Sequence, residues 1–130
     1  MEKFNLVGQY LTEMNLSIVG TDEKDEIFIV DDEDNGIKNM VIDCEEPILI
    51  LEQIIMDVPS SESNEFYIEL LKMNRNLVHG AFVLDEEGSK VIYRDTLQID
   101  NLDLNELEGS INSLSLALSE FGTKLISYAQ

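Results

Sequence analysis

The sequence predicts a single α+β domain in which helices pack on an antiparallel sheet. Apolar residues recur every three or four positions near both ends of the chain and again in the middle, which is the spacing of amphipathic helices. Short β-branched runs fill the remaining stretches, and their brief connections are typical of neighbouring antiparallel strands. A chain of 130 residues is long enough for one domain with a sizeable core.

The first half predicts a short helix followed by three or four strands. The helix ends near residue 15, and one side of it is apolar: Phe4, Val7, Tyr10, Leu11 and Met14. Gly8 weakens this helix mildly. Strands are predicted over residues 17–20, 27–30, 37–43 and 48–57, separated by acidic or turn-forming segments.

The middle of the chain predicts a second helix and then a hairpin. Pro59 ends the last strand, and Ser60 or Ser61 is the predicted N-cap, with Glu62 and Glu65 near the positive helix end. The apolar face of this helix runs through residue 74 and contains Phe66, Tyr67, Leu70, Leu71 and Met73.

The hairpin spans residues 77–84 and 89–99, with the turn at residues 85–88. Val91, Tyr93, Leu97 and Ile99 alternate onto one face of its second strand. Ile92 and Asp95 break this alternation, either as real features of the sheet or because of a bulge.

The last helix, predicted over residues 103–128, has the clearest pattern in the chain. Its apolar residues follow an unbroken alternation of three and four: Leu104, Leu107, Ile111, Leu114, Leu118, Phe121, Leu125 and Tyr128. Asp103 is placed to cap its first amides, Glu106 completes a capping box, and Leu102 can pack against Leu107. This apolar seam is predicted to pack on the sheet. The predicted order is therefore α-β-β-β(-β)-α-β-β-α.

Charge and composition narrow the classes of partner. The net charge is −19, which argues against nucleic acid and anionic membranes because like charges repel. No apolar run has the length of a membrane span, so no membrane insertion is expected. A single cysteine, Cys44, forms no intramolecular disulfide and favours a cytoplasmic location.

Catalytic and metal-binding motifs are weak, so we expect no enzyme activity and no cofactor. Nucleophilic catalysis would need Cys44 or a serine activated by His79, the one histidine, and no serine lies in a GxSxG elbow. Residues 31–36 resemble the start of an EF-hand loop, yet the twelfth position, which needs an acid, is Ile42. A small-ligand or weak cation-binding module using the acidic hairpins is the alternative function.

The long helix carries an uncharged side that predicts an interface between two copies. Eleven acids fall between Asp22 and Glu46, whereas none falls between Glu108 and Glu120. The residues off the seam there are small or uncharged: Ser110, Asn112, Ser113, Ser115, Leu116, Ala117 and Ser119. Ser113, Leu116 and Ala117 form the candidate dimer face. The other interpretation is an ordinary polar helix face.

The second half of the chain resembles the type III secretion chaperone-like group, which includes the Tir chaperone (CesT) and YbjN-type families. The residues that carry this resemblance lie between residues 66 and 127: Leu70-Leu71-Lys72-Met73-Asn74, Gly80, Leu84-Asp85-Glu86-Glu87-Gly88, Val91, Tyr93-Arg94-Asp95, Leu97, Leu102 and Leu107-Glu108. Residues 25–59, which open with Asp25-Glu26-Ile27-Phe28-Ile29, are also similar to the bacterial YjfI type (the DUF2170 family). A fourth strand before the middle helix would depart from the three expected of secretion chaperones.

The resemblance implies a small acidic cytoplasmic protein of secretion-chaperone-like fold, commonly a homodimer, that binds a protein or peptide partner. Secretion chaperones hold an extended segment of an effector against the first helix and the sheet, a mode that needs no catalytic residue. YbjN-type relatives include regulators that act through protein contacts. The matching surface on this chain would comprise Phe4, Val7, Tyr10, Leu11, Ile27 and Ile29. The same residues are also the ones that would bury the first helix.

Overall fold

A computed structural model describes residues 2–61 and 64–129 of the chain. The elements are α1 (Glu2–Glu13), β1 (Ser17–Asp22), β2 (Ile27–Asp32), the short 3-10 helix η1 (Glu33–Asn35), β3 (Ile37–Glu45), β4 (Ile48–Asp57), α2 (Asn64–Arg75), β5 (Ala81–Leu84), β6 (Lys90–Gln98) and α3 (Leu104–Tyr128). This order confirms the predicted one, with four strands before the middle helix. The predicted caps Ser60 and Ser61 precede α2 by several residues, and Glu62 lies outside the described residues.

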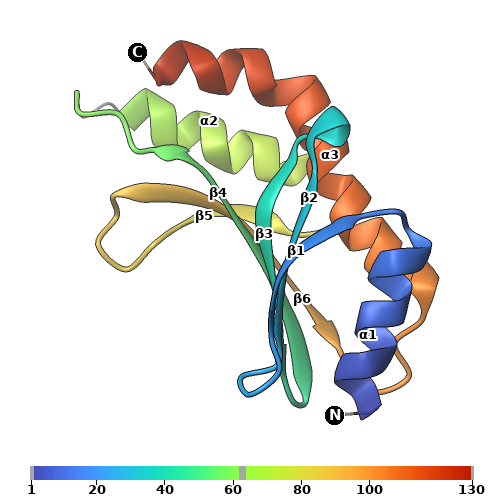
Figure 1. Ribbon diagram of the computed structural model, residues 1–130. Helices are drawn as coiled ribbons and strands as arrows, with labels where there is room; N and C mark the ends of the chain where they lie inside the picture. Colours follow the sequence, from blue (N-terminus) through green and yellow to red (C-terminus); the bar gives the residue numbers. More distant parts are fainter. Residues whose placement is uncertain (1, 62–63, 130) are drawn as a thin grey trace.

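The strands form one six-stranded antiparallel sheet in the order β1-β2-β3-β4-β6-β5. Buried side chains from the three helices and from one face of the strands join in a single core. Figure 1 shows α1 near β1 at one end of the twisted sheet and α2 with the C-terminal part of α3 at the other. The opposite sheet face carries half-buried aliphatic residues, among them Ile29, Val41 and Ile92.

The long helix begins as predicted and keeps its seam inside. The Asp103 side chain accepts a hydrogen bond of 2.8 Å from the Glu106 amide, which satisfies one free donor of the first turn. All eight seam residues are buried or half-buried. The N-terminal part of α3 covers β6, whereas its C-terminal part packs on α2, where Lys124 Nζ lies 2.6 Å from Glu69 Oε2 and the Tyr128 and Phe66 rings are 5.1 Å apart. The seam therefore covers a helix as well as the sheet.

A buried group of hydrogen bonds joins α3 to β6. The Tyr93 hydroxyl donates to the Ser110 carbonyl oxygen at 2.8 Å, and the Ser110 hydroxyl donates to Asp95 Oδ2 at 2.7 Å. Asp95 follows Tyr93 on the inner face of β6, where the Ser110 hydroxyl satisfies its carboxylate. Ile92 faces the open side of the sheet. The two exceptions to the alternation are real features of β6.

The prediction that the serines of α3 face outward is wrong for two of them. Ser110 and Ser113 are buried, and the Ser113 hydroxyl donates to the His79 carbonyl oxygen at 2.8 Å and accepts from the His79 amide at 3.1 Å. The connection between α2 and β5 covers this side of α3, so strand β5 begins at Ala81 and is shorter than predicted. Gly80, with φ of 72°, allows the chain to turn there against the Tyr93 ring, which a Cβ would approach to 2.6 Å.

The upper ends of β3 and β4 separate, as Figure 1 shows. Their pairing ends at Val41 opposite Glu52. Asn39 adopts a left-handed backbone conformation with φ of 49°, which bends β3 away, and its amide donates to Asp31 Oδ1 at 2.7 Å. The buried Gln53 side chain spans the gap: it donates to the Gly36 carbonyl and accepts from the Lys38 amide, each at 3.0 Å.

This role of Gln53 predicts a stability effect. Gln53→Leu keeps the side chain's approximate size but leaves two backbone groups without partners, so we expect the free energy of unfolding to fall by about 1–3 kcal/mol. Urea unfolding followed by circular dichroism measures it. The matched control is Gln98→Leu at an exposed position of β6, which should change stability by less than about 0.5 kcal/mol. Equal losses in the two variants would contradict the bridging role.

Candidate functional site

The six residues that the sequence predicts for partner binding do not form one exposed surface. Phe4, Val7 and Leu11 are buried in the core beneath α1, and the half-buried Tyr10 donates its hydroxyl to the Leu102 carbonyl oxygen at 3.3 Å. Ile27 and Ile29 lie on β2 with their side chains on the opposite sheet face from the buried Phe28 and Val30. Burial of helix α1 therefore accounts for three of the six.

A groove lies next to these residues, between α1 and strands β1 and β2. Its volume is about 550 Å³. Its lining comprises Phe4, Asn5, Gly8, Gln9, Thr12, Glu13, Ile18, Thr21, Glu23 and Phe28. The floor is aromatic, because the rings of Phe4 and Phe28 stack with centroids 4.3 Å apart and an interplanar angle of 11°. A Cβ at Gly8 would lie 2.9 Å from the Phe28 ring, so glycine lets the ring approach the helix backbone.

Gly8 is also the signal that sequence reasoning could have used for this groove. From the sequence alone, Gly8 is expected only to weaken the first helix mildly, as glycine does in an exposed helix. A glycine in the interior of an amphipathic helix also marks close approach of another group. Here that group is Phe28, and the open groove lies beside the contact.

One wall of the groove is the edge strand of the sheet. Strand β1 pairs with β2 and is the first strand in the sheet order, so its other edge carries no strand among residues 2–61 and 64–129. Ile18 is 37% exposed on this strand, and Val19 is more exposed still. An open strand edge offers backbone donors and acceptors to an added polypeptide strand.

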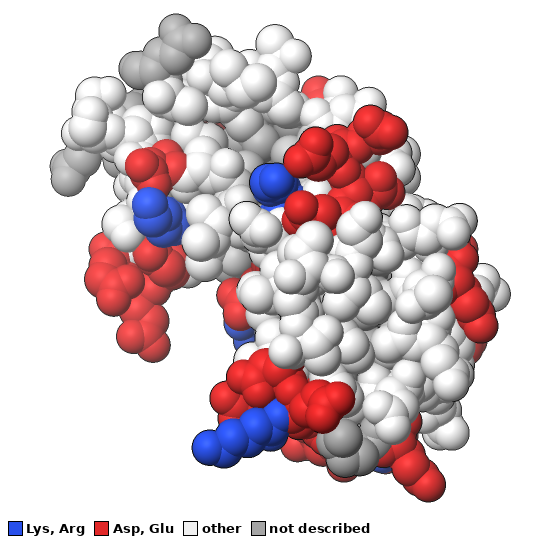
Figure 2. Space-filling view, viewed as in Figure 1, with Lys and Arg blue, Asp and Glu red and all other residues white. Residues whose placement is uncertain are grey.

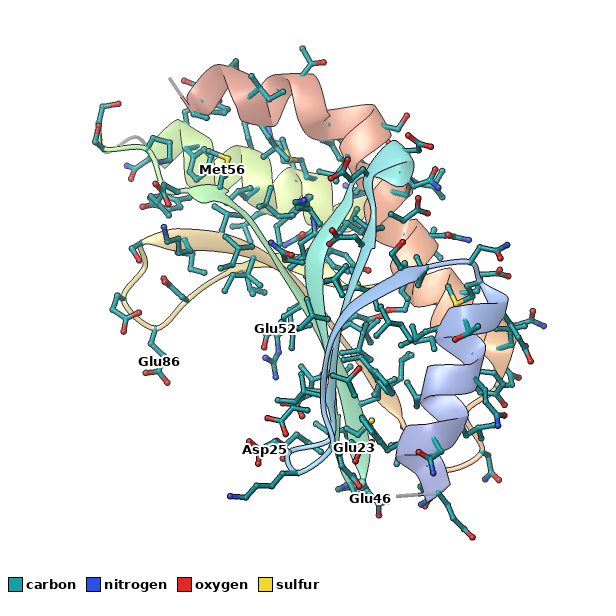
Figure 3. All side chains as sticks on the ribbon, viewed as in Figure 1. Glu23, Asp25, Glu46, Glu52, Met56 and Glu86 are labelled. Carbon is teal, nitrogen blue, oxygen red and sulfur yellow. The ribbon has the colours of Figure 1, made fainter. Side chains whose placement is uncertain are left out.

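The charged residues of the groove lie at its borders, and its floor is uncharged. Figure 2 shows a broad uncharged surface over β1 and α1 with acidic residues at its borders. Figure 3 places Glu23 and Asp25, from the turn after β1, at the same end of the sheet as Glu46. Lys3 near the start of α1 pairs with Asp100 and lies 3.9 Å from Glu46. The groove is therefore apolar at its floor and acidic at one end.

The candidate dimer face is largely covered by the chain itself. Ser113 and Ala117 are only 4% and 2% exposed, whereas Leu116 is 65% exposed. These residues nevertheless line a hollow of about 380 Å³ together with Val78, which is also exposed. Ser113 and Ala117 contribute its buried lining, and Leu116 and Val78 contribute its exposed apolar side chains.

The structure does not assemble the catalytic or cation-binding candidates into a site. Cys44 is buried in β3 opposite Leu49, while His79 is exposed in the turn before β5 and approaches Gly109 of α3. The EF-hand-like segment forms η1 between two strands, where Asp32 accepts from the Asn35 side chain and Glu33 from Lys38. Within the described residues, no three His, Cys, Asp or Glu side chains group so that they could hold a metal ion.

The comparison with protein families decides the classification of this chain. The CesT_Tir_1 family model matches residues 1–130. The chain belongs to the CesT_Tir_1 family. No curated protein matches it in sequence.

Solved structures share its fold. YbjN, a putative transcription regulator from E. coli, is similar with a TM-score of 0.70 and 14% identity over 94% of this chain and 92% of that one. A chain of the HopA1-SchA chaperone-effector complex gives a TM-score of 0.60 and 10% identity over 85% of this chain and 86% of that one. A chain of the ExsC-ExsE complex gives 0.53 and 17% identity over 89% and 88%. At these identities the likeness establishes the fold, which is secretion-chaperone-like as the sequence predicts.

Two of these relatives were solved as complexes of two proteins, SchA with the effector HopA1 and ExsC with ExsE. In the part of the chain that the structure describes, none of the helices combines the length and apolar character needed to cross a membrane.

The environment of Cys44 predicts an unreactive thiol. Burial, together with the nearby carboxylates of Glu26 and Asp43, raises the pKa of Cys44 to about 12. At pH 8 the native thiol is therefore protonated, and we expect Ellman's reagent to modify it at least about a hundredfold more slowly than in urea, where the thiol pKa returns to about 8.5. Cys44→Ser provides the blank. Equal rates in native buffer and in urea would refute the buried thiol.

Proposed function

We propose that this chain is a non-enzymatic, chaperone-like protein that holds an extended segment of a partner polypeptide in the groove between α1 and strands β1 and β2. The observation that carries the proposal is the combination of an aromatic floor, formed by Phe4 and Phe28, with the open edge of β1. Both features lie in one groove of about 550 Å³.

This geometry suits a polypeptide better than a small ligand. A bound strand would pair its backbone with β1 and direct alternate side chains toward the groove floor. The binding energy would then come from backbone hydrogen bonds and apolar burial, and neither contribution requires a catalytic group. The SchA and ExsC relatives, solved with an effector and with ExsE respectively, support a protein partner.

Electrostatics favours a partner segment with basic residues beside its apolar ones. The chain's net charge of −19 repels acidic polypeptides, and Glu13 and Glu23 line the groove itself. A Lys or Arg on the bound segment would meet these carboxylates at the border while its neighbours fill the floor.

Ile18→Glu tests this proposal. It places a charge on the exposed side of β1, so we expect the affinity for the native partner to fall by at least about tenfold, because one buried aliphatic side chain contributes about 1.5–3 kcal/mol. The full-length chain, immobilised, captures proteins from its native cell extract, and the captured partner is then titrated against each variant. Amide hydrogen exchange of α1 and β1 in the complex reports the contact directly.

The matched control is Leu71→Glu, which places the same charge on an exposed leucine of α2, away from the groove. It should bind as the wild type does. Partner binding that survives Ile18→Glu, with no exchange protection in β1, would exclude the groove as the binding site.

We also propose that two copies associate through the hollow beside Leu116 and Val78. Residues 109–119 of this acidic chain carry no acid, and Glu120 is the charged residue in the lining of the hollow. Leu116→Glu should then convert a dimer into a monomer of 14.8 kDa in sedimentation equilibrium, because the charge would be buried without a partner. Ala117 is unsuitable for this test because it is buried within the single chain. Leu71→Glu again serves as the control and should remain dimeric; a monomeric wild type would end the proposal.

A further inference from the structure

Part of strand β4 is unpaired on one side, although the strand lies in the interior of the sheet. The β3–β4 pairing ends at Val41 opposite Glu52, whereas β4 stays paired with β6 on its other side, from Ile48 opposite Gln98 to Asp57 opposite Lys90. The Gln53 side chain bridges the gap next to this point, and residues 54–57 of β4 beyond it have no paired strand on the β3 side in the described part of the chain. Such an edge offers backbone N–H and C=O groups to another strand.

Hollows flank this edge on both faces of the sheet. On the open face a hollow of about 400 Å³ is lined by three aliphatic residues, Val41, Ile54 and Ile92, and by three polar ones, Lys38, Asn39 and Glu52. On the helix side a hollow of about 370 Å³ is lined by residues without charge, including Ile55, Met56, Leu118 and Ile126. Figure 3 shows Met56 at the upper part of β4, near α2, and Glu52 lower on the strand.

Two isoleucines lie exposed at these hollows. Ile54 is 64% exposed on the open face, and Ile126 is 63% exposed on α3. The side chains of a strand alternate between the two faces of its sheet, so a strand added to β4 would direct alternate residues to the two hollows. The unpaired edge therefore lies between an apolar hollow on the helix side and a hollow of mixed character on the open face, and an added strand could place side chains in both.

We propose that the gap between β3 and β4 accepts an extended segment of a partner polypeptide as an added strand on β4, at a site separate from the α1 groove. We call it the β3–β4 cleft, bordered by residues 37–40 of β3, residues 54–57 of β4 and Leu118 to Ile126 of α3. Leu118 lies under the cleft beside Gly36, where an added Cβ would be 2.9 Å from the leucine side chain.

The surrounding charges specify the chemistry of the occupant. Lys38, at the border, lies 3.6 Å from Asp31 and 3.0 Å from Glu33, so its charge is already compensated. Lys90 at the far end pairs with Asp57. With Asp34 of η1 added, the acids around the cleft outnumber the bases, so the segment is one with apolar residues at alternate positions and Lys or Arg at its ends. A second copy of this chain fits poorly, because both of its edge strands lead into acids. Strand β1 ends in Asp22 and continues into Glu23, and β5 is followed by Asp85-Glu86-Glu87.

A synthetic probe tests the cleft in the full-length chain. The peptide has nine residues, with valine and leucine at alternate central positions, threonine between them and two lysines at each end. Fluorescence anisotropy of the labelled peptide measures its affinity. We expect Ile126→Glu and Ile54→Glu each to weaken binding by about tenfold or more, since each replaces an exposed isoleucine of the cleft with a charge.

Three controls isolate the mechanism. Leu71→Glu alters a similarly exposed residue of α2 outside the cleft and should change affinity by less than about twofold. A peptide of the same sequence with N-methylated alternate amides cannot pair as a strand and should not bind. Replacing the lysines with glutamates should abolish binding at low salt, and amides 54–56 should exchange more slowly with the lysine peptide bound.

Distinct results would overturn the inference. Absence of binding at millimolar lysine peptide, or binding that Ile18→Glu abolishes while Ile54→Glu and Ile126→Glu leave it intact, would exclude the cleft; the second result would place the peptide in the α1 groove and leave the proposed function standing. Dissociation of a wild-type dimer by Ile126→Glu, in sedimentation, would assign the cleft to a second copy of the chain and refute a separate partner.

Discussion

The hydrogen bond from the Tyr93 hydroxyl to the Ser110 carbonyl fixes where the long helix lies on the sheet. Tyr93 is buried, and its hydroxyl also reaches the His79 carbonyl oxygen at 3.2 Å, so sheet, helix and the turn before β5 meet at one side chain. Gly80 and Gly109 keep side chains out of this crowded junction. A buried phenol without such partners would cost free energy, so the contact restricts both the rotation and the axial position of α3. That position carries Leu118 to Gly36 and directs Leu116 and Ile126 outward, and therefore determines both hollows beside this helix.

The helices, their order and the seam of α3 could be predicted because periodicity and capping are local properties. Asp103 and Glu106 mark the start of α3 through contacts within one turn, and those contacts do not depend on the rest of the fold. The burial of Ser110 and Ser113 could not be predicted in this way. Serine is compatible with a solvated helix face. Ser110 is internal because β6 lies against it, and Ser113 is internal because residues 76–80 cross that side of the helix. A serine on a helix can therefore be exposed or buried, and only its tertiary contacts determine which.

Neither the α1 groove nor the β3–β4 cleft could be predicted from the sequence, and the reasons are related. Phe4, Val7 and Leu11 fit the pattern of a binding surface and the pattern of a core face equally well, and the structure uses them as core. Gln53 carried a readable signal, since it continues the inward positions Leu49 and Leu51 as a polar residue. A buried glutamine needs hydrogen-bond partners for its amide group. The backbone groups of Gly36 and Lys38 are free to bond it because β3 bends away from β4 at Asn39. This bend depends on contacts with a neighbouring strand, so the alternation of residues within one strand does not predict it.

Open strand edges create an aggregation hazard, and the distribution of charge in this chain addresses it. Acids concentrate in the turns of the first three hairpins, at residues 22–26, 31–34 and 43–46, so negative charge borders the α1 groove and the β3–β4 cleft. Two copies that approach through β1 would bring these acids together, and repulsion opposes the pairing at moderate ionic strength. A basic extended segment meets attraction at the same borders. Under the proposed function, the acidity that opposes self-pairing through β1 would also favour basic partner segments, so one property of the composition would act on both self-association and partner choice.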